Sequence, residues 1–507
     1  LEREERLEED YLISYAIYNA TKELMKIEGF NFKYLFDNIE SYDTYKKEYS
    51  KVYAETAERI RQGGFKIYTS LDREKQAILQ AKIDEHLSYS TEKQENGKYS
   101  LQGAAVLINN ETGYVEAIVG GRGEDNFNRG FLAVRQPGSV IKPIVSYGPA
   151  YDTLEYYPSY KYEDKYTDKG PKNYNNTYIG KVSLRDALAR SINTVAFNLL
   201  GDIGVNKGLE YLANMEFDTL SYIDKDNGAI ALGGFTYGVR VVDLAKSYYT
   251  IYNNGVYTDQ GCVMKIESEE DGVIYNKDHR EKVIYSPDTA YMVLDSLIAC
   301  VEKPYGLSRS RAIRGIQTGS KSGTTNSQKD VWFSGMSPYY TLSVWVGYDT
   351  PKSTGTYGSG LPGVIWQNIM VDLHKDITNP KKFSKPPTII ELPINWEGKV
   401  VNYNTGMKDI FSMDMVNLED RVREQERLEQ QLIFEEKIRE QIEEGIREIE
   451  NFILLNYDDV MFLEEKEREL IREIEKIEIN IELKNELLEL VDNAFRQYDL
   501  DVYFIKL

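Results

Sequence analysis

The chain is poor in the residues that most often carry out chemistry. Its 507 residues include two cysteines, Cys262 and Cys300, and three histidines, His86, His279 and His374. Two isolated cysteines exclude a disulfide scaffold and a CxxC zinc site. We expect both to be free or buried thiols, and the alternative is that they pair with each other in an oxidising compartment. The histidines lie far apart in the sequence, and the G-x-S-x-G turn of many serine hydrolases is absent. Any acyl chemistry here needs a base other than imidazole.

The chain also lacks long apolar runs and an excess of positive charge. No stretch of about 18 apolar residues is present, and the first residues do not have the pattern of a signal peptide. With 61 basic and 82 acidic residues the net charge is −21. This charge argues against nucleic acid as a partner, because phosphate binding relies on clustered Lys and Arg. Hydrophobic residues make up 41% of the chain, enough for folded cores, and the length predicts two or three domains.

Most of the negative charge is concentrated at the C-terminal end. Residues 417–507 contain 27 acidic and 13 basic residues, a net charge of −14. Apolar residues recur there at three- and four-residue steps after Asn417, which predicts a capped helix, and a second such run follows a turn at 456–459. We therefore expect an acidic helical hairpin. One stretch, Ile477 to Leu483, alternates apolar and polar residues as a strand does. The apolar stripe either packs on the chain's own body or binds a partner, and both interpretations stay open.

The rest of the chain predicts a mixed fold. Residues 1–64 are charged, rich in tyrosine and mostly helical in pattern, and residues 65–98 contain a strand-like run, a helical run and a polar loop. Beyond residue 99, short β-type runs and longer helical runs follow one another: strands at 104–108, 115–119, 331–333 and 341–346, and helices at 184–200 and 241–252. Strands at both ends of a domain with helices between them predict an α+β fold, whose sheet joins distant parts of the sequence.

One serine and one lysine have the spacing that acyl chemistry without histidine requires. A lysine can serve as the base for a nucleophilic serine when burial or a second cation lowers its pKa. On a helix starting at Ser139, the hydroxyl of Ser139 and the amine of Lys142 share one face, because positions three apart are neighbours. The spacing alone is weak evidence, since Ser90 and Lys93 have it within a polar loop. A helix-capping serine beside a surface lysine is the alternative.

Two further motifs strengthen the catalytic interpretation. Ser191-Ile192-Asn193 is the only S-x-N in the sequence, Lys321-Ser322-Gly323 is the only K-[ST]-G, and both follow the serine-lysine pair in that order. The three elements resemble the motif set of the serine penicillin-recognising enzymes, which comprise the penicillin-binding proteins and β-lactamases. The resemblance to a class A penicillin-binding protein's transpeptidase domain extends from about residue 64 to residue 370, in the runs 135–139, 183–185, 191–194, 321–325, 330–335, 345–349 and 361–363.

The resemblance implies an α+β fold with an antiparallel sheet flanked by helices. The segments expected on this basis are a helical linker region at 1–64, the start of a strand-helix segment at 65–98, the transpeptidase domain at 99–385, a connector at 386–416 and the acidic helical extension at 417–507. Members of this family are anchored to the cytoplasmic membrane of bacteria and work on its outer face. We therefore expect the sequence to be a piece of a longer protein. It lacks the acidic glycosyltransferase motif of class A proteins, so we do not expect it to polymerise glycan.

The resemblance also assigns catalytic roles to residues that match the motifs. Ser139 would be the nucleophile. Lys142 would be its base, kept neutral by desolvation and by the charge of Lys321. Ser191 would relay a proton towards the leaving amine. The backbone N–H groups of Ser139 and Thr324 would form the oxyanion hole, in which losing one donor typically costs about 2.7 to 4 kcal/mol. The reaction would require no metal and no organic cofactor.

A second set of residues would hold the substrate. Lys321 would face the substrate's terminal carboxylate, and the amide of Asn193 would hold its backbone. Gly323, which has no side chain, would let an extended substrate lie against its strand, with Ser322 and Thr324 on either side. Ser322 replaces the commoner threonine of this motif, which keeps the hydroxyl and removes a methyl group.

The activity that the resemblance implies is D,D-transpeptidation in cell-wall synthesis. The donor would be a peptidoglycan stem peptide ending in D-Ala-D-Ala on the lipid-linked precursor polymer, and β-lactams would mimic it. One alternative is hydrolysis, by a D,D-carboxypeptidase or a β-lactamase, although the E-x-x-L-N segment of class A β-lactamases is absent. Another is a non-catalytic β-lactam sensor or scaffold whose acidic C-terminal helices bind a cell-wall or division partner.

Overall fold

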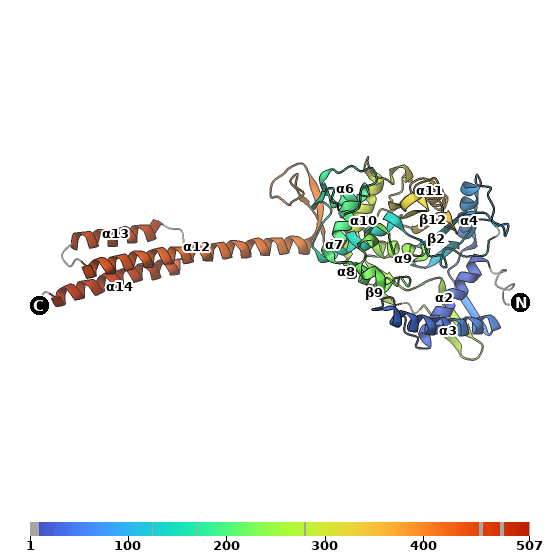
Figure 1. Ribbon diagram of the computed structural model, residues 1–507, viewed down its shortest axis with the longest axis horizontal. Coiled ribbons are helices and arrows are strands. Elements are labelled where there is room, and N and C mark those ends of the chain that lie inside the picture. Colours follow the sequence, from blue (N-terminus) through green and yellow to red (C-terminus); the bar gives the residue numbers. More distant parts are fainter. Residues whose placement is uncertain are drawn as a thin grey trace. The chain divides into compact units, whose positions relative to one another are not determined.

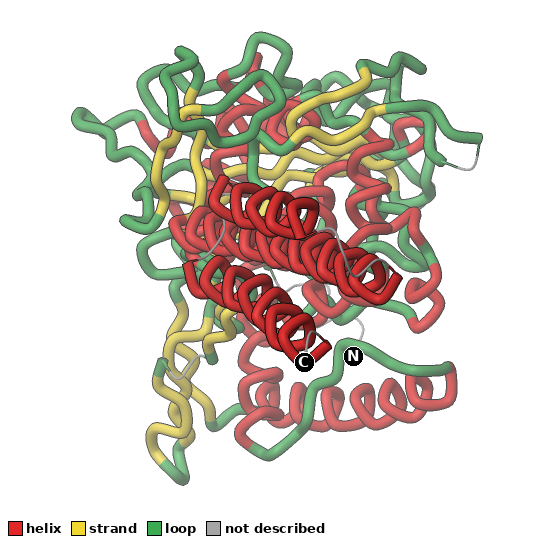
Figure 2. Tube along the Cα trace, turned by 90° about the vertical axis from the view of Figure 1, so that its left-hand side faces the viewer, coloured by secondary structure: helices red, strands yellow, loops and turns green. Residues whose placement is uncertain are grey.

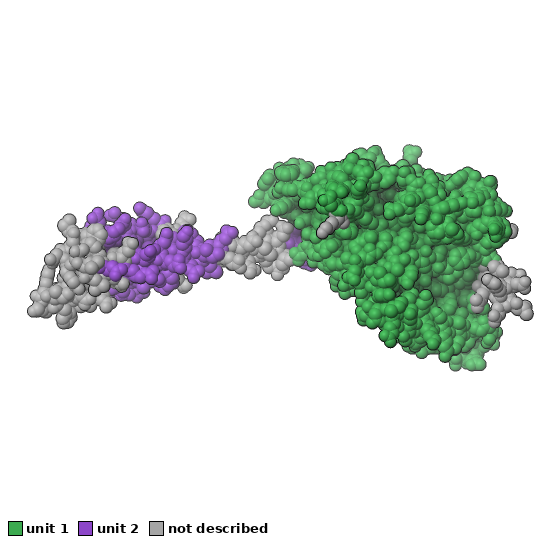
Figure 3. Space-filling model, viewed as in Figure 1, with its two compact units in different colours: residues 1–413 green, residues 414–507 purple. Residues whose placement is uncertain are grey.

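The chain divides into two compact units, Leu1–Met413 and Asp414–Leu507, which Figure 3 colours separately. The computed structural model describes residues 10–123, 125–168, 170–277, 280–455, 460–476 and 481–505. Figure 2 colours the helices and strands of both units by type. No helix among these described residues is both long and apolar enough to cross a membrane.

A five-stranded antiparallel sheet organises the first unit (Figure 1). Its spatial order is β10-β11-β12-β2-β3, and the strands are β2 (Leu101–Asn109), β3 (Val115–Val119), β10 (Gly319–Thr324), β11 (Asp330–Met336) and β12 (Tyr340–Tyr348). Leu342 on β12 lies opposite Leu107 on β2 and Gly335 on β11, so the sheet joins segments far apart in the chain. This arrangement confirms the predicted α+β fold. β10, which carries the K-S-G motif, lies at one edge of the sheet.

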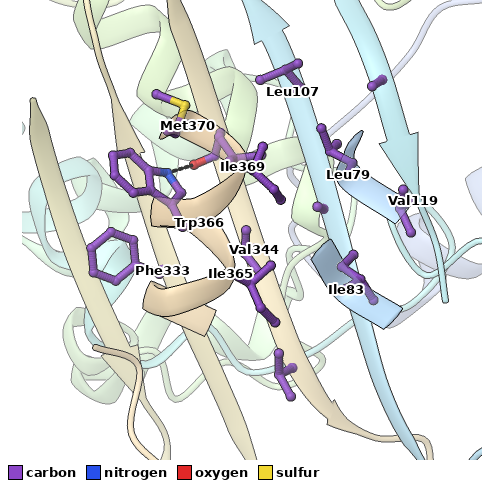
Figure 4. Close-up of a cluster of buried hydrophobic side chains, with 14 of the residues drawn as sticks. Leu79, Ile83, Leu107, Val119, Phe333, Val344, Ile365, Trp366, Ile369 and Met370 are labelled. Carbon is purple, nitrogen blue, oxygen red and sulfur yellow. Dashed lines mark hydrogen bonds between the residues drawn. The ribbon is translucent and has the colours of Figure 1, made fainter. Parts of the chain in front are cut away.

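Two helices pack on one face of this sheet and bury a hydrophobic core. They are α4 (Arg73–Leu87) and α11 (Leu361–His374). Alternate residues of the strands, such as Leu342, Val344 and Val346, face these helices, as the two-residue period of a strand requires. Trp366 on α11 is fully buried among them, and its indole N–H donates to the Leu342 carbonyl at 3.0 Å (Figure 4). The indole is thus buried without an unpaired donor.

The opposite face of the sheet is also covered by helices. Helix α9 (Val241–Tyr252), whose bounds match the predicted 241–252, packs on β2, β11 and β12, and α10 (Pro287–Glu302) packs on β10. The expected single helix at 184–200 is instead two helices, α6 (Leu184–Ala189) and α7 (Asn193–Ile203), interrupted at the S-x-N motif. Two further helices of this unit are α5 (Gly148–Thr153) and α8 (Val205–Asn214).

The residues before 99 contribute to the same unit as the sheet. Helices α2 (Tyr11–Ile27) and α3 (Ile39–Gln62) contain most of the predicted linker region. The predicted strand-like run is β1 (Phe65–Thr69), which pairs with β7 (Val263–Ser268), itself paired with β8 (Gly272–Asn276). An ion pair of 2.7 Å between Lys26 and Asp259 holds α2 against this region.

Three further strand pairs complete the first unit. They are β4 (Lys161–Asp164) with β5 (Gly180–Ser183), β6 (Val256–Thr258) with β9 (Glu281–Val283), and β13 (Ile389–Pro393) with β14 (Lys408–Ser412). The last pair lies in the segment expected to be a connector, and β14 contacts α10. This segment is therefore folded onto the first unit.

The described residues of the second unit form three helices, where a hairpin of two was expected. They are α12 (Met413–Leu455), α13 (Val460–Lys476) and α14 (Ile481–Ile505). Helix α12 begins at Met413, so Asn417 lies inside it and does not cap it. Leu483 lies in α14 and not in a strand, while Ile477, Ile479 and the turn expected at 456–459 lie outside the described residues.

A hydrophobic cluster explains why helix prevails in this unit. It contains residues of all three helices: Ile438, Ile442, Leu470, Ile474, Leu487, Val491 and Phe495. Each helix contributes residues at four-residue steps, which a helix places on one face and a strand does not. The part of the α12 stripe at Ile438 and Ile442 therefore packs against the other helices of its own unit, whereas Leu432 is exposed.

Candidate active site

The turn that bears Ser139 packs closely against the K-S-G strand. A 3₁₀ turn, η1 (Gly138–Ile141), begins at Gly138 and not at Ser139, and a π-helical turn (Pro143–Tyr147) follows Lys142. Gly138 has a positive φ of 56°, and a Cβ there would lie 3.0 Å from the Thr324 carbonyl. A Cβ on Gly323 would lie 2.6 Å from the Pro137 carbonyl oxygen. Glycine on both sides thus lets the two backbones touch.

Lys142 lies at the centre of the predicted site and is fully buried. Its Nζ is 2.7 Å from Asn193 Oδ1, 2.8 Å from the Ser191 carbonyl oxygen and 3.3 Å from both Ser191 Oγ and the Ile192 carbonyl oxygen. The first motif and the S-x-N motif, about 50 residues apart in the chain, therefore meet through one amine.

The break between α6 and α7 supplies these oxygens. Ser191 has a positive φ of 56°, a left-handed conformation that is uncommon for a residue with a Cβ. Asn173 supports the break: its Oδ1 accepts the backbone N–H groups of Asn193 at 2.9 Å and Thr194 at 3.3 Å, and its amide donates to Asp164 at 2.8 Å. Sequence reasoning missed Asn173, because it belongs to no motif and lies in an irregular segment.

Lys321 completes the cluster from the edge strand. Its Nζ donates to Ser191 Oγ at 2.9 Å and to the Ser322 carbonyl oxygen at 2.9 Å, and the residue is 1% exposed. The Ser191 hydroxyl therefore lies between two lysines. The structure thus brings Lys142, Ser191, Asn193 and Lys321, from all three motifs, into one hydrogen-bonded group.

Burial gives the two lysines unusual acid-base properties. Burial and, after it, the charge of Lys321 lower the pKa of Lys142 well below its usual range. Burial also lowers the pKa of Lys321, to about 8. Two cations this close repel each other strongly in a dry environment. The two lysines therefore disfavour being charged at the same time, and the repulsion from Lys321 adds to the effect of burial on Lys142.

The remaining predicted residues lie around this cluster. Ser139 is half-buried one turn before Lys142, whose backbone N–H donates to the Ser139 carbonyl. Within the described residues, the Ser139 hydroxyl makes no hydrogen bond to another group. Ser322 is buried, and the Thr324 hydroxyl accepts the backbone N–H of Gly358 at 3.0 Å. The side chain of Thr324 thus anchors a neighbouring loop, a role that the motif did not predict.

The described residues offer little to a metal ion. Across these parts of the chain, no group of three or more His, Cys, Asp or Glu side chains is arranged to hold one. Cys262 and Cys300 are both buried and are not paired with each other.

Comparison with known proteins identifies the family. The model of the penicillin binding protein transpeptidase domain matches residues 103–371. The chain is 32% identical over 363 residues to penicillin-binding protein 1A of Clostridium perfringens, covering 65% of this chain and 52% of that protein. It is 32% identical over 382 residues to penicillin-binding protein 4 of Bacillus subtilis, covering 73% of this chain and 58% of that protein. The chain thus spans little more than half the length of these relatives.

Solved structures share the fold. Penicillin-binding protein 1A from Haemophilus influenzae has a TM-score of 0.58 at 20% identity, with 69% of this chain and 72% of that chain covered. PonA1 from Mycobacterium tuberculosis, solved in complex with penicillin V, has a TM-score of 0.58 at 22% identity, with 76% of this chain and 98% of that chain covered. The motifs, the fold and the matched domain agree, and the chain belongs to the penicillin-binding protein transpeptidase family.

Proposed function

We propose that this chain is a serine D,D-transpeptidase that cross-links peptidoglycan stem peptides. One observation carries the proposal: the Ser191 hydroxyl lies 2.9 Å from Lys321 Nζ and 3.3 Å from Lys142 Nζ. Lys142 itself lies one helical turn after Ser139. A hydroxyl held between a cation and a neutral amine can pass a proton in a defined direction. The family match supports the same activity.

The direction of the proton relay follows from which groups can donate. A charged Lys321 only donates, so Ser191 Oγ accepts from it and its own proton is free. A neutral amine has two N–H groups and one lone pair. If Lys142 gives its two protons to its nearest acceptors, Asn193 Oδ1 and the Ser191 carbonyl, its lone pair is left for a hydroxyl. That lone pair receives the proton of Ser139 as the reaction begins.

The first half of the reaction forms an acyl-enzyme. Ser139 Oγ attacks the carbonyl carbon of the penultimate D-alanine of the donor, and its proton goes to Lys142. The tetrahedral oxyanion is held by the backbone N–H groups of Ser139 and Thr324. The C–N bond then breaks, and the proton passes from Lys142 through Ser191 to the leaving nitrogen. The products are D-alanine and an ester on Ser139.

The second half transfers the acyl group to an amine. An amine from a neighbouring strand attacks the ester carbonyl and loses a proton to Lys142 by the reverse path. The C–O bond to Ser139 breaks, Ser139 regains its proton, and a new amide cross-link leaves. During both halves Lys321 pairs with the donor's carboxylate when that group is present, and Asn193 and Gly323 border the donor's backbone.

The proposal also covers inhibitors and location. A β-lactam carries a reactive amide and a carboxylate, so it would acylate Ser139 and pair with Lys321 as the donor does. The penicillin V complex of PonA1, which shares the fold, is consistent with β-lactam binding. Because the stem peptides lie outside the cytoplasmic membrane, the chain would work at its outer face.

Labelling with a fluorescent penicillin tests the nucleophile. We expect the wild-type chain to be labelled and Ser139→Ala to be unlabelled. Ser90→Ala is a matched control, because Ser90 shares the S-x-x-K spacing but is not part of the lysine cluster. Labelling that persists in Ser139→Ala, or disappears in Ser90→Ala, would contradict the assignment.

Product analysis separates transfer from hydrolysis. A D-Ala-D-Ala peptide analogue is incubated with an amine acceptor, and the products are identified by mass spectrometry. A transpeptidase forms the amide product, whereas a D,D-carboxypeptidase releases only the shortened peptide. Labelling by penicillin with no turnover of any peptide would indicate a sensor.

A further inference from the structure

Two exposed tyrosines from distant parts of the chain meet beside the proposed site. The Tyr174 hydroxyl donates to the Tyr357 hydroxyl at 2.9 Å, and the two rings lie edge to face with centroids 5.8 Å apart. Tyr174 is 82% exposed and Tyr357 is 44% exposed. Such exposure is unusual for an ordered aromatic pair, because exposed apolar rings gain little from packing. The catalytic cluster does not use either residue.

The segment that carries Tyr174 is bonded to the S-x-N motif. The carbonyl of Lys172 accepts the side-chain amide of Asn193 at 2.8 Å, and Asn173 accepts the backbone N–H of Asn193 at 2.9 Å. Asn173 is buried, whereas Tyr174 is exposed. The base of the segment is therefore fixed at Asn193, and the ring of Tyr174 extends outward from there.

The loop that carries Tyr357 is fixed to the K-S-G strand. The backbone N–H of Gly358 donates to the Thr324 hydroxyl at 3.0 Å. A Cβ on Gly358 would lie 2.3 Å from the Gly323 carbonyl oxygen, so this loop touches the backbone of β10. Tyr357 thus extends from the opposite side of the proposed donor path, the side formed by β10.

These contacts close a ring around the proposed donor path. Its inner side is the buried group of Lys142, Ser191 and Lys321, and its outer side is the contact between the two tyrosines. We propose that Tyr174 and Tyr357 form an aromatic clamp across the donor path, which selects slender, extended peptide donors over bulky ones. This inference rests on the proposed function, because it assumes that the donor lies between Asn193 and β10.

The clamp has a defined energetic consequence. A bulky acyl group beside Gly323 would require the two rings to part, whereas a slender extended chain would pass beneath them. Breaking one edge-to-face contact and one exposed hydrogen bond between hydroxyls corresponds to an about tenfold preference for slender donors over bulky ones. Either tyrosine alone cannot close the ring, so removing one should have the same effect as removing both.

Acylation rates with two β-lactams of different size test the clamp. The probes are 6-aminopenicillanic acid, which has no acyl side chain, and a penicillin whose side chain carries a fluorescent dye. The measured quantity is the second-order acylation rate constant of the bulky probe divided by that of the small probe. We expect this ratio to rise about tenfold in Tyr174→Ala and in Tyr357→Ala, with no further rise in the double variant. Tyr357→Phe, which keeps the ring and loses the hydroxyl, should raise it about threefold.

Tyr166→Ala is the matched control. Tyr166 is 51% exposed and makes an edge-to-face pair of the same 5.8 Å separation with Tyr178, so the variant removes a similar pair whose two rings come from one segment, 166–178, and not from the loop that carries Tyr357. We expect its ratio to equal that of the wild type.

The possible failures are distinguishable. If the wild type is acylated normally and both alanine variants keep its ratio, the clamp is overturned and the proposed function stands. A double variant whose effect is the product of the single effects would also overturn it, since the residues would then act independently. If a correctly folded wild-type chain is acylated by neither probe, the proposed function fails and the clamp with it.

Discussion

The charge of Lys321 should set an upper pH limit for reaction with anionic donors and β-lactams. Burial lowers the pKa of Lys321 to about 8, so its ammonium group loses its proton as the pH rises through that value. The neutral amine still donates to Ser191 but no longer attracts a carboxylate strongly. We therefore predict that the second-order acylation rate constant of benzylpenicillin falls above about pH 8.

The size of the fall follows from the fraction of charged Lys321. Two pH units above its pKa, about 1% of the ammonium remains, so the rate constant at pH 10 should be about 100-fold below its plateau. On the acid side, protonation of Lys142 removes the base, so the rate constant should rise with pH through the lowered pKa of Lys142. The complete profile is bell-shaped, and it reports the free enzyme.

The assay measures acylation by mass spectrometry between pH 5 and about pH 10, with Ser139→Ala as the blank for spontaneous hydrolysis of the β-lactam. Lys321→Arg keeps a cation that stays charged over this whole pH range, so its rate constant should be lower overall but should not fall at alkaline pH. The methyl ester of benzylpenicillin has no carboxylate and should show no alkaline fall with the wild type. An alkaline fall of equal size for the acid, the ester and the arginine variant would refute the role of Lys321.

Three further substitutions test the packing that places the site. Gly323→Val would put a Cβ 2.6 Å from the Pro137 carbonyl oxygen and displace the Ser139 turn. Acylation should therefore fall at least about 100-fold with little change in melting temperature. An unchanged acylation rate would contradict the close contact between the two backbones. Asn173→Ala removes the acceptor of the Asn193 and Thr194 backbone N–H groups. The urea midpoint should fall, because buried groups lose their partners, and acylation by the folded variant should fall about tenfold; a folded variant with the wild-type acylation rate would make Asn173 purely structural. Trp366→Ala should lower the free energy of unfolding, measured by urea titration, by about 3 to 5 kcal/mol, because it leaves a cavity in the core. A loss below about 1 kcal/mol would contradict the core described for α11.

The main sheet was predictable because its strands have clear local patterns. The runs at 104–108, 115–119, 331–333 and 341–346 all fall within observed strands, and α9 has the predicted bounds. The interruption of the helix expected at 184–200 was not predictable. Its residues favour a helix, whereas the left-handed Ser191 lies where Lys142 donates to the Ser191 carbonyl and Asn173 accepts the backbone N–H of Asn193, which are tertiary contacts. A local pattern carries no information about such contacts.

The candidate site was found through motif order and resemblance, not through geometry. The spacing of Ser139 and Lys142 predicted a shared helical face, but it did not distinguish this pair from Ser90 and Lys93. Tyr357 and Asn173 were not predicted as site residues, because they belong to no motif. They lie in irregular segments that only the fold brings to the site. In the second unit, the strand-like alternation was misleading at Ile481 and Leu483, because four-residue steps further along favour a helix that shares a core with α12 and α13.

The central claim is that a neutral Lys142 activates Ser139, and the acylation rate of Lys142→Ala tests it most directly. We predict that the second-order rate constant with benzylpenicillin at pH 7 falls about 10²- to 10⁴-fold, the range for losing a general base, in a variant that keeps the wild-type circular dichroism spectrum. Lys93→Ala, which removes the lysine of the other S-x-x-K sequence, should react at the wild-type rate. A folded Lys142→Ala variant that acylates as fast as the wild type would contradict the claim.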